Sequence, residues 1–209
     1  MSHGAGIRRT SGLRAASRGA TGKVLVLVAH PAMNRSRVNR ALADAIVGMD
    51  GVTVHDLYEA YPDFDIDVQH EKELLLAHPI IVWQHPFYWY STPAILKEWQ
   101  DLVLEFGWAY GPGGTALHGK TFLQAITTGG PDSAYVEGGY NRYTMRQLLA
   151  PIDQTMHLCG VRSLPPFLLH GSHRLGEAEI DAGAGRYRSV IEALRDGTMA
   201  AEPHAANGA

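Results

Sequence analysis

Three short segments, each directly after an apolar run, carry side chains that could together bind a flat, phosphorylated ligand. The first follows Val24–Ala29 and contains His30, Ser36, Arg37 and Asn39, close to the start of an expected helix. The first turn of a helix has free backbone N–H groups and a partial positive charge, which favour phosphate. The hydroxyl, guanidinium and amide groups strengthen that preference. The alternative is that Asn34 or Ser36 merely caps the helix.

The second segment is Gln84-His85-Pro86-Phe87-Tyr88-Trp89-Tyr90, which follows the apolar run Pro79–Trp83 and precedes a helical pattern near Thr92. It is expected to be the loop that leaves a buried strand, and it holds four aromatic rings and a proline. Aromatic faces and a fixed backbone suit a flat ring system. The alternative is that these rings pack on neighbouring helices, or on a partner chain.

The third segment is Thr127-Thr128-Gly129-Gly130, with Tyr135 five residues beyond the second glycine. Two glycines after a strand allow the backbone to approach a ligand closely. The threonine hydroxyls and exposed N–H groups could bond to the polar edge of a ring. An ordinary turn between a strand and a loop is the alternative interpretation.

Strands and helices alternate around these segments. The expected strands are nearly all apolar, which predicts a parallel sheet covered by helices on both faces. We expect strands at Val24–Ala29, Val52–Leu57, Pro79–Trp83, Thr121–Thr127 and Val161–His170, the last interrupted by Pro165-Pro166. We expect helices at Val38–Met49, Ile66–His78 (capped by Asp65), Thr92–Phe106, Tyr143–Leu158 (broken or bent by Pro151) and Glu177–Leu194.

This alternation predicts an α/β three-layer sandwich with a five-stranded parallel sheet in the order 2-1-3-4-5. In that order the strands before the three segments are neighbours, and ligands bind at the carboxyl ends of such strands. Phosphate on the first segment and a flat ring between the other two describe FMN. The first segment has no glycine, which argues against a P-loop NTPase and a dinucleotide-binding Rossmann domain.

Composition and charge describe an ordinary globular protein. The chain has 209 residues, 45% of them hydrophobic, and a net charge of −3, so nothing suggests nucleic-acid binding. Cys159 is the one cysteine, which excludes an intrachain disulfide and fits a reducing compartment. No cluster of residues has metal-ligand spacing. No apolar run reaches the ~18 residues that a membrane span requires, and we expect a cytoplasmic protein.

The ends of the chain differ from its centre. Residues 1–22 hold four arginines and no acidic residue, and we expect a disordered basic extension there. Binding of this tail to anionic lipid is the alternative. Residues 198–209 are expected to form a disordered tail. One folded domain should therefore occupy residues 23–197.

The chain resembles the flavodoxin-like NAD(P)H:quinone oxidoreductases over about residues 23–197, and most closely the bacterial ancillary proteins of glutathione-regulated potassium-efflux systems. The residues that carry the resemblance are Ala29-His30-Pro31 with Ser36 and Asn39, Trp83-Gln84-His85-Pro86 with Trp89-Tyr90, Phe106–Gly111 with Gly114–Lys120, and Thr127–Gly130. The run 106–120 is the most specific of these.

The resemblance implies a homodimer with bound flavin, which is FMN in the ancillary proteins and FAD in some relatives. Its cofactor-binding residues would be His30, Ser36, Arg37, Val38, Asn39, Pro86, Phe87, Tyr88, Trp89, Thr127, Thr128, Gly129 and Gly130. Tyr135 falls where animal relatives place a catalytic tyrosine. Those relatives place a histidine six residues further on, where this chain has Asn141.

The resemblance further implies two-electron transfer from NAD(P)H to a quinone through the flavin, with both substrates using one site in turn. The alternative function is a regulatory flavoprotein that activates a glutathione-gated potassium-efflux antiporter, peripherally on the inner face of the cell membrane. A small electron carrier is the third interpretation, but carriers usually lack a loop like Phe106–Lys120.

Overall fold

The computed structural model describes residues 22–199, in which six parallel strands form one sheet. The strands run in the order β2-β1-β3-β4-β5, and β6 also pairs with β4, which confirms the predicted order. The last predicted strand forms two short strands, one on each side of Pro165-Pro166, so the sheet has six strands rather than five. The strands are β1 (Val24–Val28), β2 (Val52–Asp56), β3 (Ile80–Pro86), β4 (Thr121–Thr127), β5 (Arg162–Ser163) and β6 (Phe167–Leu169).

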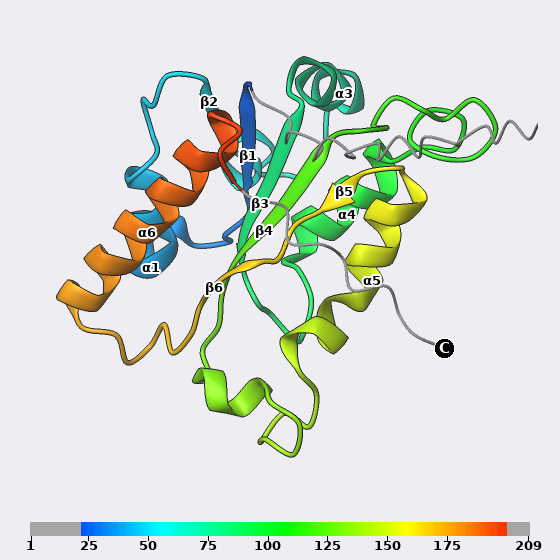
Figure 1. The fold of residues 1–209 in the computed structure, drawn as a ribbon. Coiled ribbons are helices and arrows are strands. Elements are labelled where there is room, and N and C mark those ends of the chain that lie inside the picture. Colours follow the sequence, from blue (N-terminus) through cyan, green and yellow to red (C-terminus); the bar gives the residue numbers. More distant parts are fainter. Residues whose placement is uncertain (1–21, 200–209) are drawn as a thin grey trace, which may run out of the picture.

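Helices cover both faces of the sheet, as Figure 1 shows, and this confirms the three-layer prediction. The helices α1 and α6 pack on one face, and α2, α3, α4 and α5 pack on the other. The α-helices are α1 (Val38–Asp44), α2 (Leu57–Ala60), α3 (Val68–Ala77), α4 (Ala94–Val103), α5 (Met145–Leu158) and α6 (Glu177–Arg195). Two 3-10 helices are η1 (Met33–Arg35) and η2 (Asp132–Tyr135).

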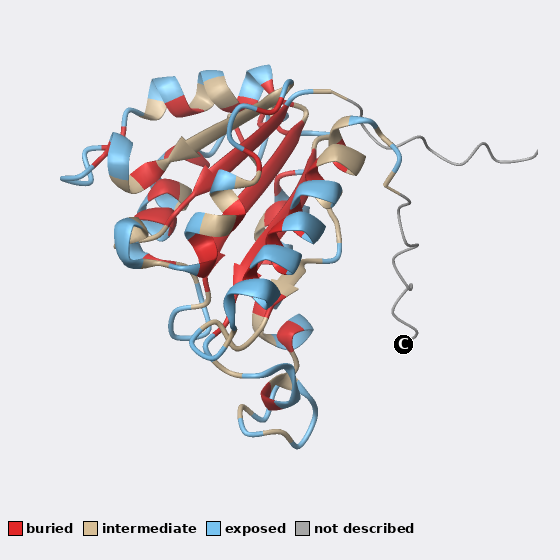
Figure 2. Cartoon of the chain, turned by 90° about the vertical axis from the view of Figure 1, so that its left-hand side faces the viewer, coloured by how far each residue is buried: buried red, intermediate tan, exposed pale blue. Residues whose placement is uncertain are grey.

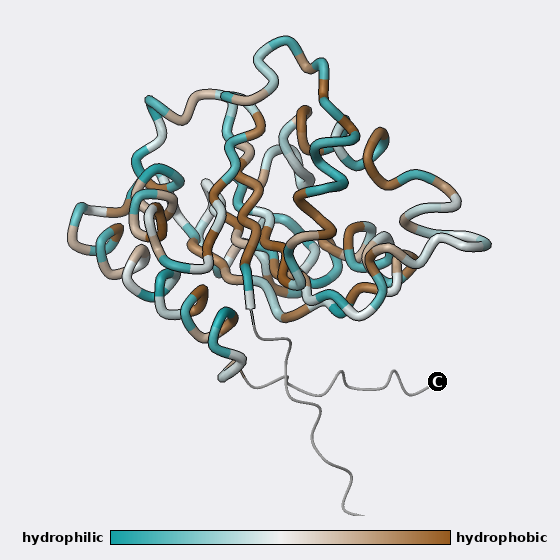
Figure 3. Tube along the Cα trace, turned by 90° about the horizontal axis from the view of Figure 1, so that it is seen from above, coloured by the Kyte–Doolittle hydropathy of each residue, from teal (hydrophilic) through white to brown (hydrophobic). Residues whose placement is uncertain are grey.

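The central strands form the core. Every residue of β1, β3 and β4 is buried, whereas β2 at the sheet edge is only half-buried. The buried strands lie between helices whose outer sides are exposed (Figure 2). Figure 3 shows many of the hydrophobic segments in the middle of the molecule. Burial on both faces explains why apolar residues predominate in these strands instead of alternating with polar ones.

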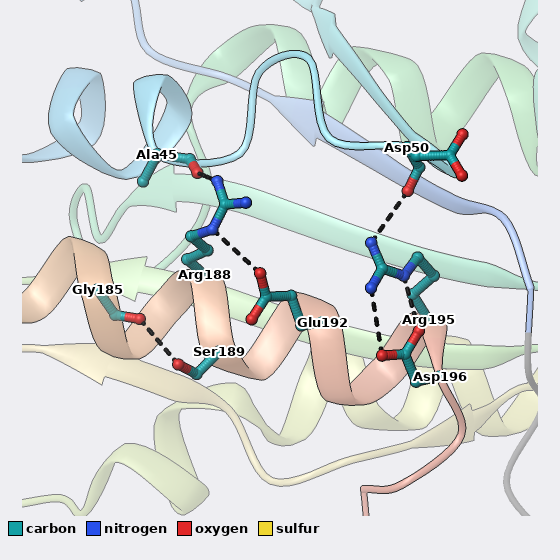
Figure 4. Close-up of polar contacts among 8 residues, drawn as sticks. All are labelled: Ala45, Asp50, Gly185, Arg188, Ser189, Glu192, Arg195 and Asp196. Atoms are coloured by element: carbon teal, nitrogen blue, oxygen red, sulfur yellow. Dashed lines mark hydrogen bonds and ion pairs between the residues drawn. The ribbon is translucent and has the colours of Figure 1, made fainter.

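Two arginines join the helix α6 to the segment that follows the C-terminal end of α1 (Figure 4). Arg188 donates from Nη1 to the carbonyl of Ala45 over 2.7 Å and pairs with Glu192. Arg195 donates from Nη1 to the carbonyl of Asp50 over 3.2 Å. These bonds satisfy carbonyl groups in the segment between α1 and β2, and they fix α6 against that segment.

Two predicted helices begin or end elsewhere because of local hydrogen bonds. The predicted helix Val38–Met49 ends at Asp44, and the chain continues in turns through Gly48, which has a positive φ of 76°. Ile46 and Met49 are still buried, so the apolar spacing reflected burial rather than helix. The helix predicted from Ile66 with Asp65 as its cap begins at Val68, because the Asp67 carboxylate accepts the N–H of His70 over 3.0 Å.

The other helix boundaries shift for similar reasons. The predicted strand Val52–Leu57 stops at Asp56, whose carboxylate accepts the N–H of Tyr58 and starts the unpredicted α2. The helix predicted over Thr92–Phe106 is shorter, and Pro93 is its N-cap. The helix predicted over Tyr143–Leu158 begins at Met145 behind a capping box and passes through Pro151 without a break. The last helix is extended by one residue, to Arg195.

The largest correction concerns β3, which was predicted to end at Trp83 and continues to Pro86. Gln84, His85 and Pro86 pair with Ala125, Ile126 and Thr127 of β4, so they belong to the strand rather than to the loop. The ring-bearing loop is therefore shorter and begins at Phe87. The predicted tails 1–22 and 198–209 fall outside the described residues except for Gly22, Thr198 and Met199.

Candidate functional site

Two adjoining cavities, each of about 580 Å³, lie where the loops leave the carboxyl ends of β1, β3 and β4. Phe87 and Gly129 line both of them. We call the first the α1 cavity, lined by His30, Ala32, Arg35, Ser36, Arg37, Val38, Asn39, Pro86, Phe87, Tyr88, Thr127, Gly129, Ser172 and His173. The aromatic cavity is lined by Phe87, Trp89, Tyr90, Gly129, Gly130, Pro131, Ser133, Ala134, Tyr135, Tyr140, Asn141 and Arg174.

The structure thus brings the three predicted segments together. All predicted site residues line one of the two cavities except Thr128, which is buried behind them. The convergence follows from the strand order, because neighbouring parallel strands end at the same sheet edge.

A buried hydrogen-bond network supports the floor of the α1 cavity. Asn39 donates from Nδ2 to Oγ1 of Thr127 over 2.8 Å, and Gln84 donates from Nε2 to the carbonyl of Asn39 over 2.9 Å. Oδ1 of Asn39 and Oε1 of Gln84 are buried and have no partner among the described residues. An unpaired buried acceptor is costly. Of these two residues only Asn39 lines the cavity, so its Oδ1 is the acceptor suited to a hydroxyl or N–H donor of a ligand.

The wall of the α1 cavity is polar and cationic. Ser36 Oγ accepts the backbone N–H of Asn39 over 3.2 Å, so this hydroxyl does cap the first turn while it also lines the cavity. Arg35 and Arg37 are exposed at its mouth. His30 accepts the N–H of Ala32 at Nδ1 over 3.1 Å, and partial burial lowers the pKa of its imidazole. A neutral histidine and two guanidinium groups make the mouth suitable for an anion.

Aromatic rings dominate the second cavity. The rings of Phe87 and Tyr135 lie 6.1 Å apart, and those of Phe87 and Tyr90 lie 6.2 Å apart at an interplanar angle of 87°. Trp89 and Tyr90 have positive φ angles of 50° and 63°, which is rare for bulky residues and costs on the order of 1–3 kcal/mol for each residue. The turn thereby directs consecutive aromatic residues around the cavity rather than into the core.

Asn141 occupies a defined place in this cavity. Its Oδ1 accepts a hydrogen bond from the hydroxyl of Tyr90 over 3.1 Å, and its N–H bonds to the carbonyl of Ala134 over 3.0 Å. The residue therefore ties the loop after β3 to the loop after β4. His85, by contrast, is fully buried in β3, and burial lowers its pKa to about 4, so it is a neutral core residue outside both cavities.

Comparison with known proteins is decisive for the family. Residues 22–191 match the family described as flavodoxin-like fold. The chain belongs to the flavodoxin-like family. It is 49% identical, over 81% of its length and 92% of the relative's, to a Yersinia enterocolitica protein named glutathione-regulated potassium-efflux system ancillary protein KefG.

Two solved flavodoxin-like structures are also similar. General stress protein 14 of Treponema denticola, solved in complex with FMN, has a TM-score of 0.78 and 37% identity and covers 82% of this chain and 99% of its own. A protein from P. pentosaceus described as NADPH-quinone reductase has a TM-score of 0.74 and 30% identity, covering 80% and 96%. Within residues 22–199, every helix is too short or too polar to span a lipid bilayer.

The loop after β6 adds residues to this flavodoxin-like site that were not predicted as site residues. Ser172 and His173 line the α1 cavity and Arg174 lines the aromatic cavity. The only sequence signal for them is that His170-Gly171-Ser172-His173 follows the last expected strand, a position that fits either the border of a pocket or a hydrogen-bonded loop. Arg35 and Tyr140 also line the cavities, and no local pattern distinguished them from other exposed residues.

Proposed function

We propose that this chain is a flavin-dependent NAD(P)H:quinone oxidoreductase that binds FMN across the two cavities. The observation that carries the proposal is the division of one continuous site into a cationic, hydrogen-bonding half and an aromatic half, joined at Phe87 and Gly129. A phosphorylated chain suits the first half and a flat ring suits the second. The FMN complex of the Treponema protein and the description of the P. pentosaceus protein as an NADPH-quinone reductase support the same cofactor and substrates.

The residues present fit FMN. Arg37, Ser36 and the unpredicted Arg35 would hold the phosphate, with His30 and Val38 beside them. The unpartnered Oδ1 of Asn39 suits a hydroxyl of the ribityl chain.

The ring half of the site fits equally well. Pro86 to Trp89 would lie along the ring, where Tyr88 and Trp89 each line one cavity. Within residues 22–199, no carbonyl accepts the backbone N–H groups of Gly129 and Gly130, so both are available to the polar edge of the ring. Thr127 supports Asn39, and Thr128 supports Gly130 through its hydroxyl.

The cofactor would supply the redox chemistry, accepting a hydride from NAD(P)H and then passing two electrons to a quinone that replaces NAD(P)⁺ in a ping-pong sequence. The chain supplies placement and electrostatics. The N–H groups of Gly129 and Gly130 form a fixed set of donors for negative charge at the ring edge. We assign Tyr135, whose ring lines the aromatic cavity, as a further donor and as the catalytic residue.

We further propose that the functional unit is a homodimer. The support is the exposure of large aromatic side chains around the aromatic cavity: Trp89 is 93% exposed and Tyr140 91%. Such a cluster at a cavity mouth is typical of a surface that another chain covers. Sedimentation or light scattering should give the mass of two chains, and the double variant Trp89→Ala, Tyr140→Ala should give the mass of one.

A second candidate function is regulation of a potassium-efflux antiporter, as a peripheral protein on the inner face of the membrane. The KefG name of the 49% identical relative is the observation that favours it. The two functions are compatible. Co-purification with an antiporter from the same organism would support regulation, and activity toward quinones without any such association would favour the enzyme alone.

The direct test of the cofactor is a titration of the apoprotein with FMN, followed by quenching of flavin fluorescence. We expect saturable binding with one FMN per chain. Riboflavin should bind more weakly, because it lacks the phosphate that the α1 cavity would hold. The proposal would be refuted if the protein quenched the fluorescence of neither FMN nor FAD.

A further inference from the structure

The loop after β6 is joined to the loop after β4 by three backbone hydrogen bonds. The N–H groups of Thr128, Gly171 and Ser172 donate to the carbonyls of Leu169, Gly130 and Thr128 over 3.1, 2.9 and 2.9 Å, respectively. Both loops therefore move as one unit. His170 sits at the centre of this unit, half-buried, and neither the cofactor nor the proposed catalytic residue accounts for it.

The contacts around Thr128 favour one of the two neutral forms of His170. Oγ1 of Thr128 lies 2.8 Å from the carbonyl of Gly130, to which it donates, and 2.8 Å from Nδ1 of His170. A hydroxyl has only one proton to donate. Both 2.8 Å contacts of the hydroxyl are hydrogen bonds only when Nδ1 of His170 carries a proton and donates to Thr128. A proton on Nε2 would turn the hydroxyl toward Nδ1 and away from Gly130.

The ring of His170 also packs against the proposed catalytic tyrosine. The ring centroids of His170 and Tyr135 lie 5.4 Å apart at an interplanar angle of 31°. Tyr135 belongs to η2, and its other ring neighbour is Phe87 from the loop after β3. His170 thus supports two parts of the proposed flavin site at once. Its Nδ1 contacts Thr128 in the loop after β4, and its ring packs against the ring of Tyr135.

We propose that His170 is a positioning residue of the flavin site, held as the Nδ1–H tautomer by Thr128. In this role it directs the Thr128 hydroxyl to the carbonyl of Gly130 and leaves the N–H groups of Gly129 and Gly130 facing the site. Its ring packs against the ring of Tyr135 and holds that ring in place. The proposal rests on the proposed flavin function for its consequence, but the tautomer itself is a property of the ligand-free chain.

The tautomer can be measured by nitrogen-detected or long-range proton–nitrogen NMR on ligand-free protein labelled with ¹⁵N-histidine, at a pH where His170 is neutral. The chemical shifts of the two ring nitrogens identify which is protonated. We expect Nδ1 to be protonated in the wild type and in Thr128→Ser. In Thr128→Val the hydroxyl is gone, and the Nε2–H form preferred by free histidine should return. A wild-type His170 protonated on Nε2 would overturn the proposal.

A second measurement tests the consequence for the cofactor. His170→Phe keeps a ring against Tyr135 but has no donor, whereas His170→Asn keeps an amide N–H at the place of Nδ1. We expect His170→Phe to raise the Kd for FMN about threefold to tenfold, the loss expected for one neutral hydrogen bond. His170→Asn should recover most of that loss. His157→Phe, at an exposed position on α5, is the control and should bind like the wild type.

The two measurements separate the possible failures. Equal FMN affinity in His170→Phe and the wild type would overturn the positioning role, even if the tautomer is as expected. Wild-type protein that binds no flavin would instead refute the proposed function. In that case the NMR result still decides whether Thr128 fixes the state of His170.

Discussion

Asn39 in α1 donates a hydrogen bond from Nδ2 to Oγ1 of Thr127 at the end of β4, over 2.8 Å and across 88 residues of sequence. Both side chains are buried, and both line the α1 cavity. The bond joins the segment suited to phosphate with the segment suited to the edge of a ring. It therefore sets the spacing between the two ends of the proposed cofactor.

Replacing Asn39 by Ala should weaken FMN binding. The variant loses the Oδ1 acceptor and leaves the hydroxyl of Thr127 without its donor, a change that costs ~1–3 kcal/mol. The Kd for FMN should rise about tenfold or more. Fluorescence titration measures this directly. Asn34→Ala is the matched control, because Asn34 is exposed in η1 and lines neither cavity.

Replacing Arg37 by Gln should weaken only the binding of ligands that carry the phosphate. We expect the Kd for FMN to rise about threefold to tenfold, as for an exposed charge-assisted hydrogen bond. The difference should shrink at high salt, where exposed charges are screened. Binding of riboflavin should not change. Arg40→Gln serves as the control, since Arg40 lines neither cavity. An equal rise in the Kd for riboflavin would show that Arg37 does not act through the phosphate.

Replacing Tyr135 by Phe removes one hydroxyl donor and keeps the ring contacts with Phe87 and His170. If the hydroxyl stabilises charge at the ring edge, reduction of bound FMN by NADPH should be roughly tenfold slower, with FMN affinity nearly unchanged. Stopped-flow absorbance would give the rate. Tyr143→Phe is the control, because Tyr143 is exposed outside both cavities. Unchanged rates of hydride transfer and quinone turnover in Tyr135→Phe would refute the catalytic role.

A buried carboxylate on the opposite face of the sheet links the helical layer to β2 and to α4. Glu71 is fully buried and accepts hydrogen bonds from Nε2 of His55, the hydroxyl of Tyr61 and Nε1 of Trp99, over 2.7, 2.7 and 2.8 Å. Burial alone would raise the pKa of this carboxyl, but the three hydrogen bonds together lower it below its usual 4.5. Folding thus favours the charged form.

The Glu71 cluster should make stability depend on acid pH. Because the folded-state pKa is lowered, its contribution is present above pH ~4.5 and is lost as the pH falls through the folded-state value. Glu71→Gln should lower the free energy of unfolding by ~1–3 kcal/mol at pH 7. The variant should also lose less stability than the wild type as the pH is lowered from about 5 through the folded-state pKa of Glu71. Urea denaturation across this range measures both, with the exposed Glu98→Gln as the control.

The sequence was sufficient to predict the sheet order because mainly apolar strands alternate with helix-length segments, a pattern typical of a parallel sheet covered on both faces. The strand β4 was predicted with its observed bounds. The end of β3 was missed because Gln84 and His85 are polar, yet both are fully buried in the sheet. Their burial depends on pairing with β4, which lies about 40 residues away. Local composition cannot reveal that pairing.

The same limit applies to the site. The segments after β1, β3 and β4 were found because they directly follow predicted strands. The contributions of Ser172, His173 and Arg174 depend on backbone bonds between the loops after β4 and β6. The strand before that loop is only three residues long, and Pro165-Pro166 obscured its end. Arg35 was missed because an exposed arginine in an unpredicted 3-10 helix has no distinguishing pattern.

The most direct test of the central claim is an anaerobic reaction of the purified protein, loaded with FMN, followed by flavin absorbance. Addition of NADH or NADPH should bleach the flavin absorbance, and one equivalent of menadione should restore it in a single two-electron step. Rates at varied NAD(P)H and menadione concentrations should give the parallel lines of a ping-pong mechanism. Bound flavin that NAD(P)H does not reduce, or reduced flavin that menadione does not reoxidise, would contradict the proposed oxidoreductase.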